Sequence, residues 1–228
     1  HPDPSVERRS GFLPPTLTDT KNLGAGINIP YFYAIGQDKD FTFTNKLYAT
    51  ENPLFLGEYR QAYSDSNLIL DFGYTEGYKK LSATKKSGEK SHLFSKFTKN
   101  FIGKNMSSNF LSIQTQETSN DKYLKLYKIK TDLVDFNENI LENSIDFTHE
   151  DKNLFFGINA SIYETLNQDY NDKYEYILPE LTFDKNLFND NRYGIMDLQS
   201  NFKIHNYDTN KTTKFFINDL DWDISDYN

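Results

Sequence analysis

Hydrophobic and polar residues alternate with a period of two along most of this chain of 228 residues. Leu68, Leu70 and Phe72 fall on one face of an extended segment, whereas Asp71 and Thr75 fall on the other. Such alternation is typical of β-strands with one apolar and one polar face, and helical periodicity is almost absent from the chain. The pattern predicts an all-β protein in which Leu70 and Asp71 face opposite sides of the sheet.

The alternation and the turn residues that interrupt it predict about twelve strands. They cover residues 8–17, 24–35, 39–49, 53–64, 67–79, 91–102, 106–117, 140–150, 153–166, 173–184, 192–206 and 212–222. The connections are short enough for neighbouring strands to pair as antiparallel hairpins, so we expect an up-and-down meander. Two environments produce this alternation: a sandwich core against water, and lipid against the wet lumen of a membrane barrel.

The predicted connections differ in length when they are taken alternately. One set consists of residues 36–38, 64–66, 103–105, 151–152 and 185–191. The other set holds the two longest loops and consists of residues 18–23, 50–52, 80–90, 118–139, 167–172 and 207–211. Outer-membrane barrels have short periplasmic turns and longer outer loops. The pattern therefore favours such a barrel, with its N-terminal end on the periplasmic side.

Composition narrows the classes of protein further. The net charge of −8 argues against nucleic-acid binding, which needs a basic surface. The mean hydropathy is −0.72, and no apolar run approaches the roughly 18 residues of a membrane-spanning helix. The aromatic content of 16% suits the interface girdles of a membrane barrel and also a tyrosine-rich soluble β-protein. Cysteine is absent and the four histidines lack ligand spacing, so we expect no metal site.

Prolines weaken the first predicted hairpin. Pro14 and Pro15 lie in its first arm, and Pro30 lies in its second. Proline has no N–H to donate to a β-ladder, so it is tolerated mainly at edges, strand starts and bulges. Gly24 and Gly26 add backbone freedom to the second arm. These residues predict either an ordinary edge hairpin or a seam that opens.

Several short motifs resemble the lipopolysaccharide-assembly outer-membrane protein family, LptD, also known as the organic solvent tolerance family. The motif R-x-S-G-F-L-x-P matches residues 8–15, and P-Y, D-x-T, E-x-R and L-P-x-L follow in order up to about residue 185. The matched positions include Arg9, Ser10, Gly11, Phe12, Pro15, Pro30, Tyr31, Asp40, Thr42 and Pro179.

The resemblance implies an all-β, antiparallel, up-and-down transmembrane β-barrel, of which this chain is a part. Residues 1–7 would be the link from a periplasmic domain, and residues 8–228 the first part of the barrel. The implied activity is insertion of lipopolysaccharide into the outer leaflet of the outer membrane, by a translocon that is not an enzyme and has no cofactor. The implied partners are lipopolysaccharide, an LptE-type lipoprotein plug and a periplasmic lipopolysaccharide bridge reached through the N-terminal domain.

The resemblance also implies a lateral gate at the first strands. Its residues would be Gly11, Phe12, Pro15, Gly24, Gly26 and Pro30. Two alternative functions stay open at this point. One is another outer-membrane barrel, such as a porin or receptor, and the other is a soluble β-sandwich that binds carbohydrate.

Glu58 and Arg60 are two residues apart on one predicted strand, so their side chains point to the same side. The resemblance implies that they form a charge pair in the barrel lumen, and the alternative is a solvent-facing pair. Leu54 and Leu56 share their parity, which conflicts with a purely polar face. A β-bulge near Gly57 would remove the conflict.

Lysines crowd the predicted loop at residues 79–90. A basic loop could contact the phosphates of lipopolysaccharide electrostatically. The sequence favours the simpler interpretation of a solvated loop.

Overall fold

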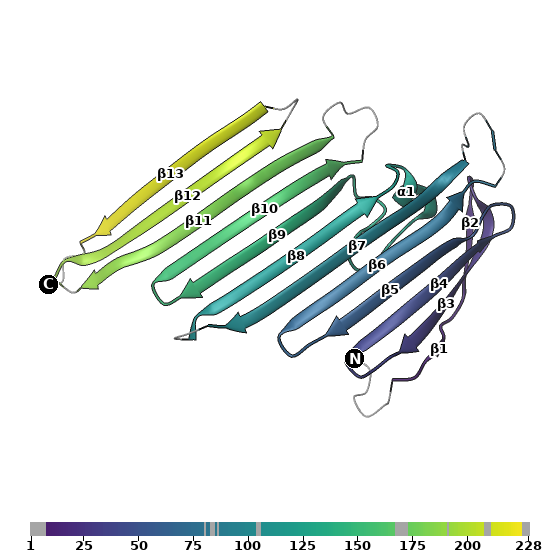
Figure 1. The fold of residues 1–228 in the computed structure, drawn as a ribbon, viewed down its shortest axis with the longest axis horizontal. Coiled ribbons are helices and arrows are strands. Elements are labelled where there is room, and N and C mark those ends of the chain that lie inside the picture. The colour runs from purple at the N-terminus through teal and green to yellow at the C-terminus, as the bar shows by residue number, and fades with distance from the viewer. Residues whose placement is uncertain are drawn as a thin grey trace. The chain divides into compact units, whose positions relative to one another are not determined.

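The structure is a computed structural model that describes residues 8–79, 81–82, 85, 87–103, 106–166, 173–190, 192–207 and 211–224. The described residues form thirteen strands and one short helix (Figure 1). The strands belong to one antiparallel sheet whose order follows the sequence, from β1 through β3 and β4 to β13, with β2 also paired to β3. This open meander confirms the predicted all-β architecture.

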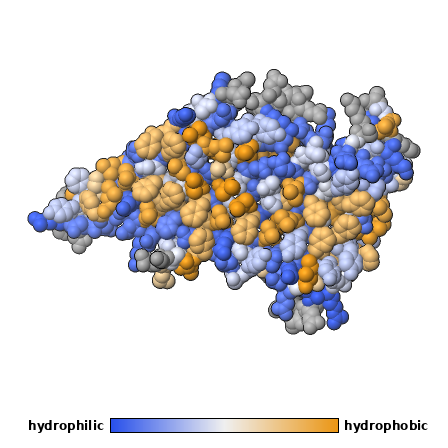
Figure 2. Space-filling model, viewed as in Figure 1, coloured by the Kyte–Doolittle hydropathy of each residue, from blue (hydrophilic) through white to orange (hydrophobic). Residues whose placement is uncertain are grey.

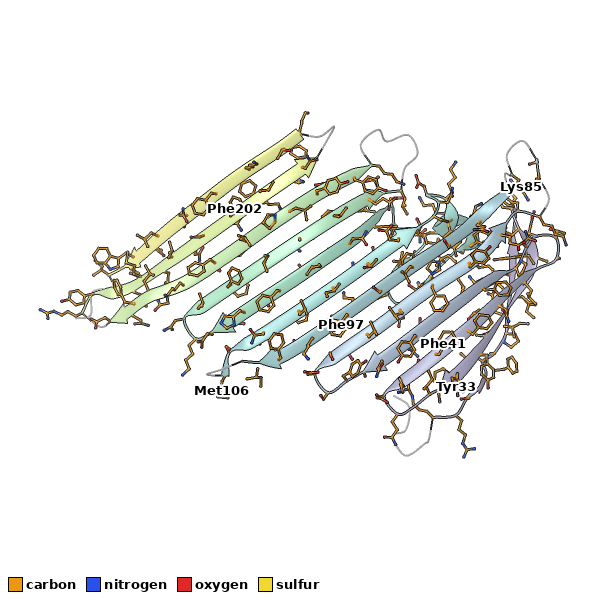
Figure 3. The ribbon with its side chains drawn as sticks, viewed as in Figure 1. Tyr33, Phe41, Lys85, Phe97, Met106 and Phe202 are labelled. Atoms are coloured by element: carbon orange, nitrogen blue, oxygen red, sulfur yellow. The ribbon has the colours of Figure 1, made fainter. Side chains whose placement is uncertain are left out.

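Most elements lie close to the predicted strands, but β11 continues to Asp190, so the predicted connection at residues 185–191 is wrong. The elements are β1 (Gly11–Phe12), β2 (Thr16–Thr20), β3 (Gly24–Ala34), β4 (Lys39–Tyr48), β5 (Leu54–Ala62), β6 (Ser66–Gly77), β7 (Ser87–Ile102), β8 (Ser108–Thr118), α1 (Tyr123–Tyr127), β9 (Ile140–Asp151), β10 (Leu154–Thr165), β11 (Tyr174–Asp190), β12 (Gly194–Tyr207) and β13 (Lys211–Asp223). Lys85 precedes β7 and Met106 follows it, so these residues mark its two ends (Figure 3).

The first predicted strand, residues 8–17, is wrong in one respect, because the chain forms two short strands there. Phe12 lies opposite Tyr31 in the β1–β3 pairing, and Thr16 lies opposite Asn28 in the β2–β3 pairing. Three residues separate Phe12 from Thr16, but only two separate Asn28 from Tyr31, so the first arm carries one extra residue. This count is that of a β-bulge, and Pro14 and Pro15 lie within it.

The prolines interrupt one ladder and spare the next. The N–H of Leu13 donates to the carbonyl of Pro30 over 2.9 Å. The N–H and C=O of one strand residue point to the same side, so the missing N–H of Pro30 faces the first arm. The ladder between β3 and β4 runs without a shift from Gly26 opposite Tyr48 to Ala34 opposite Asp40. Pro30 therefore weakens only the pairing with the arm.

The turn of this hairpin is later than predicted. Thr18 pairs with Gly26, and Thr20 pairs with Gly24, so the predicted connection at residues 18–23 is wrong for residues 18–20. The turn occupies residues 21–23 instead. Gly24 follows it directly with φ +72°, a conformation that L-residues with side chains rarely adopt.

The chain divides into two compact units. The first holds the residues up to Lys96 together with Thr115–Glu138, and the second holds Phe97–Gln114 together with the residues from Asn139 onward. In the second unit the alternation predicted from sequence recurs, with Ile145 and Ile158 exposed and Ser144 and Ser161 buried. Apolar side chains form much of the surface that faces the viewer in Figure 2.

In the first unit, strand β6 exposes apolar side chains and buries polar ones, which is the reverse of the pattern in a soluble sheet. In β6 the side chains of Phe72 and Tyr74 are 43% and 41% exposed, whereas Asp71 is 6% and Thr75 0% exposed. The sequence predicted these opposite faces for β6. Soluble proteins rarely expose a contiguous apolar face of this kind, and such a face marks a contact with lipid or with another protein.

Candidate functional site

Charged side chains form a row on the polar face of the first unit. Asp40 in β4 lies directly opposite Arg60 in β5, so both project to the same side. The Asp40 carboxylate is 4% exposed and accepts Arg60 Nε at 3.0 Å on one oxygen and Arg8 Nη2 at 2.9 Å on the other. Arg60 Nε also lies 3.4 Å from a Glu58 carboxylate oxygen. Asp40 is thus the centre of a cluster that includes the predicted Glu58–Arg60 pair.

The predicted site residues included Arg9 and not Arg8, although the motif R-x-S begins at Arg8. The structure places Arg8 on Asp40, and the Arg8 guanidinium also lies 5.8 Å from the centre of the Phe32 ring. Of the other motif residues, Ser10 accepts the N–H of Ala34 on its hydroxyl oxygen at 2.9 Å. The spacing R-x-S could have pointed to Arg8, because it is the arginine two residues before Ser10.

The remaining motif residues lie along the sheet without meeting at one point. Tyr31 pairs across strands with Phe43, and Thr42 pairs with Glu58. Pro179 lies in β11 where the pairing with β12 shifts register, between Ile177 and Glu180. A proline cannot donate to the ladder, which suits a position at such an irregularity.

The β-bulge near Gly57 that would have removed the conflict does not occur. The β4–β5 pairing keeps one register from Lys39 opposite Gln61 to Lys46 opposite Leu54. Leu54 and Leu56 therefore do share a face with Glu58 and Arg60, as their parity indicated. Leu54 is nevertheless fully buried, at 0% exposed, so another part of the chain covers it.

The cover is residues 119–138, called here the covering segment. It leaves β8, forms the short helix α1 and closes with a β-bridge between Lys130 and Asp135. The carbonyl of Tyr127 accepts Lys46 Nζ at 3.4 Å, which places the segment on the polar face beside Leu54. The buried apolar residues of the segment are Tyr123, Leu124, Tyr127, Ile129 and Val134. Leu54 and Leu56, on the polar face of β5, thus lie beside a small apolar core that the covering segment completes.

A buried chain of hydrogen bonds fixes α1 to the strands. His92 in β7 has a fully buried side chain, with Nε2 2.6 Å from Asp71 Oδ1 in β6 and Nδ1 3.0 Å from the hydroxyl of Tyr123. Burial, with smaller contributions from Tyr127 and Asp71, raises the pKa of Tyr123, so this hydroxyl keeps its proton and can donate it to His92. Gly73 makes room for the imidazole, because a Cβ there would lie 2.5 Å from His92 Cε1.

Alkali should release the covering segment. Burial raises the pKa of Tyr127 from the ordinary 10.0 to about 12 and raises that of Tyr123 as well. A phenol whose folded pKa is raised stabilises the folded form fully below pH 10, and this contribution is lost as pH rises towards 12. We expect both tyrosines to ionise later than an ordinary tyrosine in an absorbance titration. A Tyr123→Phe variant should lose one late-ionising group. Late ionisation that is unchanged in this variant would contradict the assignment.

The predicted gate residues gather along the arm and β3. The side chain of Phe12 is 76% exposed, and its ring lies edge-on to Tyr31 with centroids 5.0 Å apart. A Cβ on Gly26 would lie 2.9 Å from both the Leu47 carbonyl and the Tyr48 ring. Close packing against β4, in addition to backbone freedom, therefore requires glycine at this position.

Lys85 of the basic loop is bound within the protein. Its Nζ lies 2.8 Å from Glu51, 2.6 Å from the carbonyl of Asn22 and 4.8 Å from the centre of the Tyr78 ring (Figure 3). Lys80 and Lys86 lie outside the described residues. Lys85 thus connects the β2–β3 turn with the β4–β5 turn, and the expectation of a simple solvated lysine there is wrong.

No group of three or more His, Cys, Asp or Glu side chains could hold a metal ion within the part of the chain that the structure describes. Within the same part, no helix is long and apolar enough to cross a membrane.

Comparison with known proteins gives a partial similarity. No protein-family model matches the chain. A stretch of 53 residues is 36% identical to the LPS-assembly protein LptD of Psychrobacter cryohalolentis and to that of Methylococcus capsulatus, and 34% identical to that of Psychrobacter arcticus. The stretch is 23% of this chain and 5–6% of each relative, so the match spans only a small part of the relatives' length. Over these residues the chain is similar to LPS-assembly proteins.

Proposed function

We propose that this chain is the first part of an outer-membrane β-barrel that inserts lipopolysaccharide into the outer leaflet, through a lateral gate at its first strands. Residues 8–228 would form the first part of the barrel. Residues 1–7, which lie outside the described residues, would form the link to a periplasmic domain. The observation that carries the proposal is the antiparallel meander in which β6, β9 and β10 expose apolar side chains on one face and bury polar side chains on the other. A membrane barrel needs that arrangement, with lipid outside and water inside.

The weak first arm supports the lateral gate. Lipopolysaccharide has a polar sugar head and apolar acyl chains, so its head needs a wet lumen while its chains need a path sideways to lipid. Opening between strands provides both. Only two residue pairs hold β1 to β3, and a bulge at Pro14 and Pro15 separates them from the five pairs of β2. The arm therefore parts from β3 at a lower cost than any long hairpin of the sheet.

The proposed protein is a translocon and not an enzyme, and it needs no cofactor. The similar relatives are named LPS-assembly proteins, which supports lipopolysaccharide as the substrate. The family resemblance adds two partners, an LptE-type lipoprotein that plugs the lumen and a periplasmic bridge that delivers lipopolysaccharide. The location of the protein would be the cell outer membrane.

A porin or receptor barrel is the second candidate, and one observation favours it. The covering segment lies on the polar face, where a constriction loop of a porin would lie. A porin does not require a proline-interrupted first arm, however, so the lipopolysaccharide proposal explains more of the structure. A carbohydrate-binding sandwich is disfavoured, because the described strands form one sheet and not two packed sheets.

Depletion of the protein in its own bacterium tests the proposal. We expect lipopolysaccharide to disappear from the cell surface while outer-membrane porins remain assembled, as measured by surface labelling and by membrane fractionation. A photo-crosslinker at Phe12, which is 76% exposed beside the proposed gate, should capture lipopolysaccharide. The matched control is a crosslinker at Ile145, an exposed apolar residue within β9. Normal surface lipopolysaccharide with impaired uptake of small solutes would support the porin instead.

A further inference from the structure

We propose that Arg8, Asp40, Arg60 and Asp132 form an ionic latch that ties the N-terminal arm, residues 8–20, to the covering segment. The use of this latch as a gate control rests on the proposed function. Its mechanical part, a coupling between the arm and the segment, does not depend on what the protein transports.

The first half of the latch spans a strand. Arg8 precedes β1, Asp40 opens β4, and β3 runs between them in the sheet. Arg8 Nη2 nevertheless reaches Asp40 Oδ2 at 2.9 Å, and Arg8 Nη1 donates to the carbonyl of Gln37 at 3.5 Å. The start of the arm is therefore held to β4 by charge as well as to β3 by the backbone.

The second half of the latch leads to the covering segment. Arg60 Nε lies 3.0 Å from Asp40 Oδ1, the carboxylate oxygen that Arg8 does not contact. Arg60 Nη1 lies 3.8 Å from Asp132 Oδ2. The hydroxyl of Thr131 accepts the N–H groups of Leu133 and Val134 at 3.0 Å, which fixes the turn that carries Asp132. Gln116 of β8 donates to the carbonyl of Leu133 at 3.2 Å and holds this turn to the sheet.

The formal charges give the direction of the coupling. Asp40, Glu58 and Asp132 carry three negative charges and Arg60 carries one positive charge, so Arg8 faces a formal charge of −2. Displacing the covering segment removes Asp132 and leaves a formal charge of −1. The attraction on Arg8 then decreases, and the arm is held less firmly. Because a bulge already interrupts the arm beyond Leu13, the hold at its start decides how easily it leaves β3.

Hydrogen exchange of the arm tests the latch in the full-length protein in detergent, with mass spectrometry of peptides that cover residues 8–20. Asp132→Asn should raise exchange of the arm about two- to fivefold, the range expected for one exposed ion pair. Asp40→Asn removes both guanidinium contacts of a buried carboxylate and should raise it at least about tenfold. In the Asp40→Asn background, Asp132→Asn should have little further effect, since the connection is already broken.

Asp135→Asn is the matched control. It removes the same charge from the same segment, but Asp135 pairs with Lys130 inside the segment at 3.4 Å. Hydrogen exchange of residues 8–20 in the Asp135→Asn variant should equal that in the unchanged protein. If Asp40→Asn fails to assemble, as judged by heat-modifiable gel mobility, Arg8→Gln replaces it, because Arg8 is 46% exposed and its loss leaves the strands intact. The latch would be overturned if hydrogen exchange of the arm in these variants equalled that of the unchanged protein. It would also be overturned if Asp132→Asn and Asp135→Asn had equal effects on this exchange. Neither outcome would bear on lipopolysaccharide transport.

Discussion

Phe202→Arg is expected to impair membrane assembly of the native protein by about 2–4 kcal/mol, the cost of an arginine on the lipid face near the bilayer midplane. Phe202 lies in the middle of β12, between Leu181 of β11 and Phe216 of β13 (Figure 3). All three residues lie on the face that the alternation assigns to lipid. An arginine there must lose its hydration or distort the bilayer around it. The measurement is the folded fraction after insertion into lipid vesicles over a series of urea concentrations.

Asn201→Arg is the matched control for this prediction. Asn201 is the neighbour of Phe202 on the opposite face, where it pairs with Thr182 and donates to its hydroxyl at 3.3 Å. An arginine on the wet face keeps its water, so we expect a change below about 1 kcal/mol there. If Asn201→Arg were the more damaging substitution, the two faces of the sheet would have to be exchanged.

Replacing Pro15 and Pro30 together by alanine is expected to leave the protein assembled but to slow lipopolysaccharide delivery severalfold. Each alanine restores an N–H, and a backbone hydrogen bond contributes about 0.5–1.5 kcal/mol. The restored N–H of residue 30 would face the arm, where the Leu13 N–H already bonds to the carbonyl of residue 30. The arm would then hold to β3 more firmly, and opening would become rarer.

Delivery can be followed by crosslinking lipopolysaccharide to a probe at residue 12, and assembly by heat-modifiable gel mobility. Pro53→Ala is the control, because Pro53 lies in the β4–β5 connection and belongs to neither the arm nor β3. Delivery at the normal rate in the double variant would remove the prolines from the mechanism and leave an ordinary edge hairpin.

The strands could be predicted because the residues within each strand determine which of its faces is apolar and which is polar. In β6 and β10, successive residues alternate between lipid-type and water-type side chains, so period and bounds follow from the sequence. The register of the first arm could not be predicted in the same way. The extra residue at Pro14 and Pro15 becomes visible only when the partner strand β3 is known.

The position of the covering segment could not be predicted from the alternation of the sequence. The sequence predicted a loop for residues 118–139, and no local signal places a loop over one face of a sheet. A non-local signal was present, because Leu54 and Leu56 share a face with Glu58 and Arg60. Leucines on a polar face need an apolar cover, and the apolar residues around Tyr123 could have been recognised as that cover. The contacts of Arg60 with Asp132 and of His92 with Tyr123 depend on this tertiary contact.

The covering segment also has a consequence for the order in which the protein folds. The contact between Lys46 and Tyr127 joins residues 81 positions apart, so its loop-closure entropy is large and it should form after the local hairpins. All side chains in this contact and in the His92 chain nevertheless precede residue 139. The first unit can therefore complete its small core while β9 to β13 are still unpaired. A chain that is threaded into its membrane from the N-terminal end would then add the later hairpins, one at a time, to an edge that is already rigid.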